Sequence, residues 1–349
     1  MCSSDLLAVL LDQDGKVIDD IYIYRYAWNR YFMVVNASNE AKDWNWLSSV
    51  NNGEVLIDRQ VPQRRNLNEA VLRNLKDPAN GADRRIDIAF QGPKSLEVLM
   101  KLCDRDDERF RLSVMKRNGC MELSLCGFPV AISRTGYSGE EYGYEIFVHP
   151  DKAATVWQRI LEVGKDAGVV PIGLGARDSL RVEAGFPLYG HELAGEHELW
   201  PHVAGFPGYV KFHKPFFIGK QAMLKIEAKR SDILVRFIVT AKGVRAPRTG
   251  DPVVSSRGDV IGYVTSCAGT PSGDMVGLAI VKVKAAKPGA ISIFSIGGSQ
   301  KVKPLNPADW QSGDKTYVPT PAEIISRFPA KPSAMKKLKI ADIIRRECK

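Results

Sequence analysis

Residues 173–190 read GLGARDSLRVEAGFPLYG and form the densest cluster of charged residues and glycines in the chain. Residues 175–184 are predicted to form a short helix, which the following glycine ends. Arg177 and Arg181 lie four residues apart and share one face of that helix, where Asp178 can pair with Arg181. The glycines permit a close approach to the backbone, so this segment is the first candidate for a binding site.

Glu183 is the residue of this helix that best fits a contact with a ligand. It lies between Val182 and Ala184, and a carboxylate drawn into such an apolar place needs matched hydrogen-bond donors. A heterocycle with a ring N–H beside an exocyclic amine offers two such donors to one carboxylate. The alternative is a helix stabilised only by its own salt bridges. A dinucleotide fingerprint is not supported, because Gly173-x-Gly175 lacks the third glycine at the proper spacing.

Two further segments carry candidate residues. Asp19 and Asp20 precede an apolar and aromatic strand, where a carboxylate can accept a proton or hold positive charge on an amine-bearing reactant. The alternative is a pair of turn acids that face solvent. Residues 133–140, SRTGYSGE, surround Arg134 and Tyr137 with turn-forming glycines, and such loops often border ligand pockets. Here the alternative is a tight structural turn.

Strands and helices are both predicted before residue 231, and strands alone follow it. The first strands are predicted at residues 7–11, 17–26, 30–36, 86–90, 112–115, 121–125 and 129–133. Helices are predicted at residues 40–47, 93–102 and 152–164, with Asn36 or Ser38 capping the first and Asp151 the last. The later strands, separated by Gly, Pro and Ser, predict a small barrel or sandwich at residues 233–239, 253–254, 260–265, 275–283 and 290–296.

The segment after residue 303 is predicted to be an appendage. Thr320-Pro321 has the form of a helix start, and residues 335–346 are basic and amphipathic. With the preceding elements this predicts an α+β protein of two or three domains, as expected for 349 residues.

The composition narrows the class of protein. The chain is 44% hydrophobic and 26% charged, which is typical of soluble globular proteins. No stretch reaches the roughly 18 apolar residues of a membrane span, and the first residues do not form a secretory signal. We therefore expect no membrane association and a cytoplasmic location, or the mitochondrial matrix in a eukaryote. The six scattered cysteines are expected to be reduced thiols, without a disulfide framework.

The net charge of +9 accompanies no nucleic-acid recognition motif. We expect an acidic small molecule or acidic protein as partner, and no nucleic acid. His191, His197 and His202 fall within twelve residues but lack the H-E-x-x-H spacing that places two imidazoles on one helical face. We therefore predict no metal site.

Several segments, in colinear order over about residues 8–300, resemble the T-protein family of folate-dependent aminomethyltransferases. Residues 173–190 resemble its Gly-Leu-Gly-Ala-Arg-Asp-x-x-Arg-Leu-Glu-Ala-Gly pattern, and residues 133–140 resemble Ser-Arg-Thr-Gly-Tyr-Thr-Gly-Glu. Shorter matches are VIDDI at 17–21, VVNA at 34–37, FQGP at 90–93, FIGK at 217–220 and VTS at 264–266. On these motifs the chain is identified as a member of that family.

The resemblance implies a multi-domain α+β fold, with mixed sheets and helices around a central cavity that holds tetrahydrofolate. It implies a folate-binding region over residues 1–228, a small C-terminal β-barrel over 229–303, and a basic helical tail over 304–349. Asp20 matches the family's catalytic aspartate, and Glu183 matches the glutamate that grips the pterin ring. The other residues assigned to the folate pocket are Tyr24, Asn36, Arg177 and Tyr137.

The leading function that the resemblance implies is transfer of a one-carbon unit from an aminomethyl-lipoyl carrier (H) protein to tetrahydrofolate, with release of ammonia. A second interpretation keeps the folate site but takes a small S-, O- or N-methyl compound as methyl donor, which makes the protein a demethylase. A third is a non-catalytic folate-binding scaffold for iron–sulfur maturation. The Lys-Gly-Cys-Tyr-x-Gly-Gln signature of those scaffolds is replaced here by HKPFFIGK at 213–220, without a cysteine.

Four segments depart from the family pattern. The family has a segment before the position of Leu7 that has no counterpart here, so we expect the chain to be N-terminally incomplete. The excursion at about 57–86 and the tail after 303 are extra, and the loop at 191–201 differs. These departures bear on the one-carbon donor more than on the fold.

Overall fold

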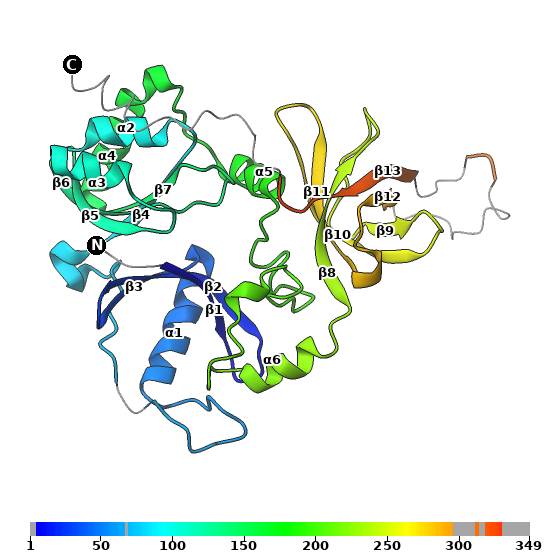
Figure 1. The fold of residues 1–349 in the computed structure, drawn as a ribbon, viewed down its shortest axis with the longest axis horizontal. Helices are drawn as coiled ribbons and strands as arrows, with labels where there is room; N and C mark the ends of the chain where they lie inside the picture. Colours follow the sequence, from blue (N-terminus) through cyan, green and yellow to red (C-terminus); the bar gives the residue numbers. More distant parts are fainter. Residues whose placement is uncertain (1–4, 67–68, 296–310, 314–317, 330–349) are drawn as a thin grey trace. The chain divides into compact units, whose positions relative to one another are not determined.

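The computed structural model describes residues 5–66, 69–295, 311–313 and 318–329 (Figure 1). The chain divides into two compact units. Unit 1 comprises the described residues up to Leu174 together with Phe216–Gly219, and unit 2 comprises Gly175–Pro215 and the described residues from Lys220 onward. The domain boundaries placed at 228 and 303 stay predictions. Within the described residues, no helix has both the length and the apolar character that crossing a membrane requires.

Unit 1 contains two antiparallel sheets, of strand order β1-β2-β3 and β4-β7-β6-β5. Its strands are β1 (Asp5–Leu11), β2 (Val17–Ala27), β3 (Arg30–Val34), β4 (Ile86–Gln91), β5 (Cys120–Leu125), β6 (Phe128–Ser133) and β7 (Gly143–Val148). Its α-helices are α1 (Glu40–Asn51), α2 (Ser95–Leu102), α3 (Asp106–Ser113) and α4 (Pro150–Val163).

The hairpin of β1 and β2 is closed by the side chain of Asp12. Its Oδ1 accepts hydrogen bonds from the backbone N–H groups of Asp14 at 2.8 Å and Lys16 at 2.9 Å. Gly15 in the same turn has φ +77°, a conformation that costs glycine little. Gly219 packs against this turn so closely that a Cβ there would lie 2.6 Å from the Asp12 carbonyl oxygen. This turn joins the two strands predicted at residues 7–11 and 17–26, which pair as β1 and β2.

The main hydrophobic core of unit 1 lies between one face of the four-stranded sheet and its helices. α4 is amphipathic and buries Ala153, Val156 and Ile160, which recur at helical spacing. They join the apolar side chains of α2 and of β4 to β7 in one cluster. Full burial of one large aliphatic side chain contributes about 1.5–3 kcal/mol, so this cluster stabilises the sheet strongly.

The other face of the four-stranded sheet packs against β2 and β3 through aromatic rings. Tyr24 and Phe147 are buried in this cluster together with Cys120 and Ala131. The rings of Phe32 and Phe147 meet edge to face, with centroids 4.8 Å apart. One face of β2 therefore points toward the four-stranded sheet, while α1 packs along the three-stranded sheet (Figure 1).

Three local predictions in unit 1 are wrong. Residues 112–115, predicted as a strand, include the end of α3, whose first turn carries three acidic residues that interact favourably with a helix N-terminus. The caps also differ: α1 follows Asn39, whose side chain makes no capping bond, and α4 follows His149, which accepts a hydrogen bond from the backbone N–H of Asp151. β7 is a strand that the sequence analysis did not predict.

Unit 2 contains a closed six-stranded barrel of order β10-β11-β8-β13-β12-β9. Its elements are α5 (Leu174–Ala184), α6 (Lys220–Glu227), β8 (Asp232–Val239), β9 (Pro252–Ser255), β10 (Val260–Gly269), β11 (Met275–Lys282), β12 (Gly289–Ser295) and β13 (Val318–Ile325). The predicted α+β class with a C-terminal barrel is confirmed. α5 begins at Leu174, the last residue of the first segment of unit 1, and ends where Gly185 takes φ +78°, as predicted.

β13 lies inside the segment predicted to be a helical tail, so the helix start at Thr320-Pro321 is wrong. Ala322 and Ile324 alternate with a period of two and are buried in the barrel core. β13 pairs with β12 on one side and β8 on the other, which closes the sheet and removes its open edges. The predicted amphipathic segment at 335–346 lies outside the described residues.

Candidate functional site

The six residues predicted for the site fall in both units. Unit 1 holds Asp20, Tyr24, Asn36 and Tyr137, and unit 2 holds Arg177 and Glu183. We call the first group the β2 group and the second the α5 group.

In the β2 group, the two neighbouring aspartates lie on opposite faces of β2, because side chains of a strand alternate. Asp19 is fully buried, and its carboxylate accepts hydrogen bonds from Asn36 N at 3.0 Å, Asn36 Nδ2 at 2.9 Å and Asn39 Nδ2 at 2.5 Å. Asp20 is only partly buried. Of the two, Asp20 is therefore the carboxylate that a reactant can reach.

Asn36 connects the two aspartates. Its Nδ2 group contacts Asp19 Oδ1, the Asp20 carbonyl at 3.1 Å and Asp20 Oδ1 at 3.0 Å. The residue follows β3 and precedes α1, so one amide determines how the loop and the β2 strand meet. This contact gives the Asp20 carboxylate a defined orientation.

Tyr24 lies in the aromatic cluster between β2, β3 and the four-stranded sheet, and its side chain has no exposed surface. Its hydroxyl lies 3.1 Å from Ser133 Oγ and 3.2 Å from Thr135 Oγ1, and it donates to Glu145 Oε2 at 3.3 Å. Burial, together with the nearby Glu145 carboxylate, raises the pKa of Tyr24 far above its usual value. The ring thus joins β2 to β6 and β7, and its assignment to the folate pocket stays a prediction.

The loop with Tyr137 is held rigidly by Gln91. The Gln91 amide donates to the carbonyls of Thr135 and Tyr144, both at 3.2 Å, and its oxygen accepts from Ser138 Oγ at 3.1 Å. A Cβ at Gly136 would collide with the Gln91 amide, which explains why this position is glycine. Tyr137 is partly buried on this ordered loop, and its ligand role stays a prediction.

In the α5 group, the charged residues have different environments. Arg181 is fully buried, and its Nε donates to Asp178 Oδ1 at 2.7 Å, as the sequence spacing indicated. Its Nη1 donates to Glu192 Oε2 at 2.7 Å, and its Nη2 donates to Ser266 Oγ at 2.7 Å. Arg177 is exposed. Arg181 therefore has a structural role, while Arg177 faces outward from the same helix.

Glu192 is the residue of this network that sequence reasoning missed. It is fully buried, and it also accepts from the Leu188 backbone N–H at 3.0 Å and from Ser266 Oγ at 2.6 Å. Its partner Ser266 lies 74 residues away, so no local pattern could reveal the pair.

Glu183 differs from these acids because its carboxylate is partly buried but receives no hydrogen bond from the described residues. Its backbone carbonyl accepts from Arg236 Nη1 at 2.6 Å, which fixes the last turn of α5. Arg236 is buried, and this burial lowers its pKa, although the Glu183 carboxylate opposes the shift. The Glu183 carboxylate thus keeps its acceptor capacity for a ligand.

Arg327, which follows β13, supports the end of α5 from the other side. Its Nε donates to the Gly185 carbonyl at 3.2 Å, and its guanidinium lies 5.3 Å from the centre of the Phe206 ring. A Cβ at Gly205, where φ is +77°, would collide with this guanidinium. Burial lowers the pKa of Arg327 to about 10.

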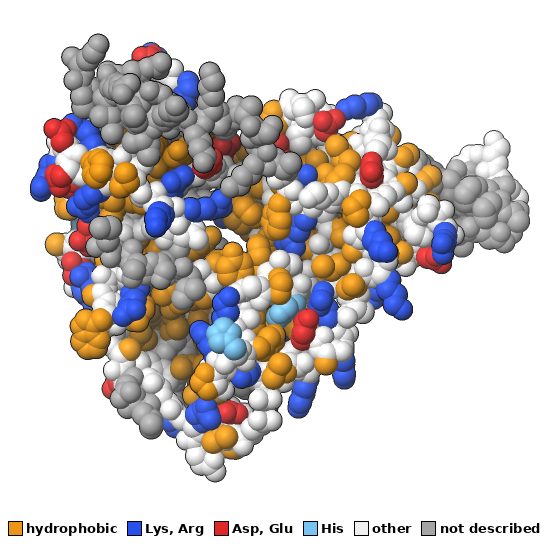
Figure 2. Space-filling model, viewed as in Figure 1, with side chains coloured by type: hydrophobic (Ala, Val, Ile, Leu, Met, Phe, Trp, Pro, Cys, Tyr) orange, Lys and Arg blue, Asp and Glu red, His pale blue; other side chains and the backbone are white. Residues whose placement is uncertain are grey.

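The excursion at 57–86 is attached to unit 1 by its basic residues. Arg59 pairs with Asp14 at 2.5 Å, and Lys76 pairs with Glu40 at 2.5 Å. The Arg64 guanidinium lies 4.1 Å from the centre of the Phe216 ring. Figure 2 shows Lys and Arg side chains spread among hydrophobic and neutral ones on the face in view. Part of the positive charge therefore serves internal pairing.

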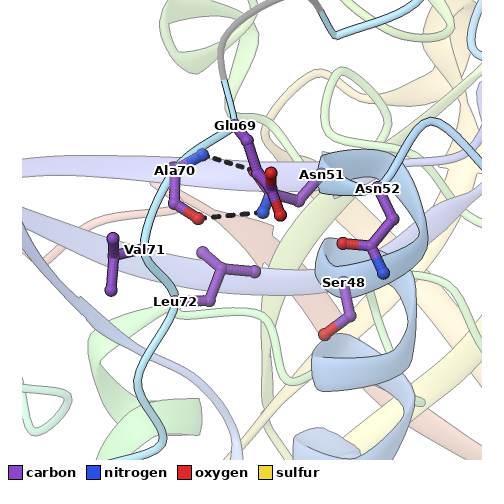
Figure 3. A pocket seen from close by; sticks show the side chains of 7 residues that line it. All are labelled: Ser48, Asn51, Asn52, Glu69, Ala70, Val71 and Leu72. Atoms are coloured by element: carbon purple, nitrogen blue, oxygen red, sulfur yellow. Dashed lines mark hydrogen bonds between the residues drawn. The ribbon is translucent and has the colours of Figure 1, made fainter.

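A hollow lies beside the C-terminal end of α1 (Figure 3). The Asn51 amide donates to the Ala70 carbonyl at 2.9 Å, and Asn51 Oδ1 accepts from the Ala70 N–H at 2.8 Å. The hollow is lined by Ser48, Asn51, Asn52, Glu69, Ala70, Val71 and Leu72. None of the six predicted site residues lines it, so it does not coincide with the β2 group or the α5 group.

Known proteins resemble this chain over most of its length. The model of the GCVT N-terminal domain matches residues 4–214. An aminomethyltransferase of Caldanaerobacter subterraneus subsp. tengcongensis is 39% identical over 288 residues, which cover 81% of this chain and 68% of the relative. An aminomethyltransferase of Halothermothrix orenii is 38% identical over 286 residues, which cover 81% and 71%.

The fold has a solved counterpart. The crystal structure of the glycine cleavage system aminomethyltransferase T from Bartonella henselae matches with a TM-score of 0.67 and 23% identity, covering 93% of this chain and 76% of that one. Fold and sequence together define a one-carbon transferase built from mixed sheets, helices and a C-terminal barrel. The chain belongs to the aminomethyltransferase (GCVT) family, as its motifs predicted.

Proposed function

We propose that this protein transfers a one-carbon unit from an aminomethyl group on a lipoylated carrier protein to tetrahydrofolate, with release of ammonia. The observation that carries the proposal is that each unit holds one acid in an environment suited to its assigned role. Asp20 is oriented by Asn36, and Glu183 is partly buried with acceptor capacity left for a ligand. The names of the relatives, aminomethyltransferases, support the same reaction.

Glu183 is the group we assign to the pterin ring. A pterin offers a ring N–H and an exocyclic amine side by side, and one carboxylate can accept from both. Asp178 and Glu192 on either side are already bonded to Arg181, so Glu183 is the acid in this stretch whose acceptors suit the ring. Arg236 holds the Glu183 backbone in place, which orders the acceptor before the ligand arrives.

Asp20 is the group we assign to the reacting centre. Tetrahydrofolate, when bound, supplies the nitrogen nucleophile that takes up the one-carbon unit. The Asp20 carboxylate orients that reactant and stabilises positive charge that develops on amine nitrogens during transfer. Asn36 donates to Asp20 Oδ1 and keeps this carboxylate in one orientation, so no reorganisation is required when charge appears.

The proposal is tested by two substitutions that separate binding from turnover. Glu183→Gln keeps one acceptor but loses the charge, and hydrogen bonds to charged groups contribute about 1.5–3 kcal/mol, so tetrahydrofolate affinity should fall by about ten- to a hundredfold. Asp20→Asn should leave this affinity nearly unchanged and lower kcat by about a hundredfold or more. Calorimetry measures the first effect, and ammonia release from an aminomethylated lipoyl carrier measures the second.

Matched controls are available in each unit. Glu196→Gln in unit 2 and Asp166→Asn in unit 1 remove exposed acids of the same type and should change neither quantity. Unchanged folate affinity in Glu183→Gln, or near-normal kcat in Asp20→Asn, would contradict the assigned roles. A wild-type protein that binds tetrahydrofolate but accepts no aminomethyl carrier would contradict the proposed donor.

A further inference from the structure

Asp43 is a buried carboxyl group in the first turn of α1. It is 1% exposed, and neither of its oxygens accepts a hydrogen bond from an N–H or hydroxyl group of the described residues. The fully buried carboxyl group of Asp19, on the strand β2 that α1 contacts, is its neighbour and acts on it through a hydrogen bond and through its charge. Two neighbouring buried carboxyl groups retain a proton between them, because their mutual repulsion adds to the cost of burying each charge.

The hydrogen bonds decide which of the two carries the proton. Asp19 accepts three bonds from amide groups of Asn36 and Asn39, whereas Asp43 accepts none. Negative charge is stable where donors surround it, so we assign the proton of the pair to Asp43. The Asp43 hydroxyl then donates to Asp19, which also gives the buried Asp43 group the partner that it otherwise lacks.

The charged groups around Asp43 agree with this order. Among the described residues they are Asp19 and Asp20 from β2, and Lys42 from its own helix. The Lys42 ammonium is engaged with Asn39 Oδ1 at 3.2 Å. Burial first, then the hydrogen bond to Asp19 and the charge of that group, raise the pKa of Asp43 to about 8.

We propose that Asp43 is a positioning residue for aminomethyl transfer: its neutral carboxyl group holds Asp19, Asp19 holds Asn36, and Asn36 orients Asp20. The interactions lead from Asp43 on α1 to Asp19 on β2, from Asp19 to Asn36 in the β3–α1 loop, and from Asn36 to Asp20 on β2. The role in transfer rests on the proposed function of Asp20, whereas the proton on Asp43 does not. If Asp43 ionised, it would repel the Asp19 carboxylate. That repulsion would disturb the hydrogen bonds of Asn36, and the Asp20 carboxylate would lose its fixed orientation.

Two substitutions of similar size distinguish a hydrogen-bond donor at position 43 from a side chain that only fills space. Asp43→Asn keeps an N–H donor for Asp19 but cannot ionise, and Asp43→Leu fills the space without a donor. In wild type, kcat should fall as the pH rises through about 8, by tenfold or more once Asp43 is ionised. Asp43→Asn should keep kcat within a few-fold at neutral pH and lose this alkaline fall. Asp43→Leu should lower kcat at least tenfold at all pH values, with folate affinity little changed.

A spectroscopic readout tests the proton without any assumption about the reaction. The infrared difference spectrum of wild type minus Asp43→Asn should contain the carbonyl band of a protonated carboxyl group at neutral pH, and the band should disappear as the pH rises through about 8. Glu54→Gln, which removes an exposed acid beyond α1, is the control and should leave both the band and the pH profile unchanged.

The outcomes are distinguishable. A wild type with the band but no aminomethyl transfer contradicts the proposed function and keeps the proton on Asp43. A missing band, or an alkaline fall of kcat that persists in Asp43→Asn, overturns the inference. Normal kcat in a folded Asp43→Leu also overturns it. If Asp43→Leu does not fold, the pH profile and spectrum of Asp43→Asn still decide.

Discussion

The buried network around Arg181 makes a strong prediction about stability. In Glu192→Gln the side chain keeps its shape but loses the charge that neutralises Arg181, which is fully buried. Removing one partner of a buried ion pair costs about 3–5 kcal/mol, because the other charge stays in a place without water. Arg181 retains Asp178, whose side chain is 45% exposed and compensates weakly. We therefore expect a loss near the lower end, about 3 kcal/mol.

The assay is urea unfolding followed by circular dichroism, combined with hydrogen exchange of β10 and β11. Ser266 links Glu192 to β10, so exchange should accelerate in that strand first. A loss of about 3 kcal/mol is a large share of the 5–15 kcal/mol that stabilise a typical domain. Glu196→Gln, four residues on and exposed, should stay within about 0.5 kcal/mol of wild type.

A double substitution tests the physical reason. Arg181→Met together with Glu192→Gln removes both charges and keeps an acceptor for Ser266. It should be more stable than Glu192→Gln alone, because no buried charge is left without a partner. A Glu192→Gln protein within about 1 kcal/mol of wild type, or a double variant with additive losses, would refute the ion-pair argument.

Two further predictions concern Gly205 and Asp43. Gly205→Ala should lower stability by about 1–3 kcal/mol in a thermal melt, because φ is +77° there and the new Cβ meets Arg327. Gly208→Ala places its Cβ in open space and should change stability little. Equal losses of stability in the two variants would contradict this prediction. Asp43 has a raised pKa, so the folded state keeps its proton while the unfolded state loses it above pH 3.8, and wild-type stability should fall between about pH 4 and pH 8. The stability of Asp43→Asn relative to wild type should therefore rise by up to about 1.4 kcal/mol per pH unit in that window. Denaturant melts at several pH values measure this difference. A difference that stays constant with pH would show that Asp43 is already ionised.

The sequence predicted features that depend on neighbours a few residues apart. The helical spacing of Ala153, Val156 and Ile160 places one face of α4 in the core, and a glycine after Ala184 ends α5 in the structure as in the pattern. The pairing of Asp178 with Arg181 follows from a three-residue spacing on one helix. Motif likeness supplied the family, which the comparisons confirm.

Local signals failed where a distant segment decided the outcome. Thr320-Pro321 has the form of a helix start, yet β13 is a strand because β8 and β12 need a partner between them to close the barrel. Residues 112–115 alternate too briefly to identify a strand, and Leu112, which packs into the core of unit 1, lies with Ser113 in the last turn of α3.

The sequence by itself predicted most of the strands and helices and singled out the acids of the candidate site, because periodicity, glycines and short motifs act over a few residues. Only the tertiary structure decided what each acid does. Asp19 and Asp20 are adjacent and chemically alike, and packing against α1 buries one of them beside Asp43 while the other stays accessible. Glu183 and Glu192 differ in the same way, since Ser266 arrives from β10 to satisfy only Glu192. Burial and hydrogen-bond donors come from segments far apart in the chain, and they set the protonation state of a carboxylate and its accessibility to a ligand.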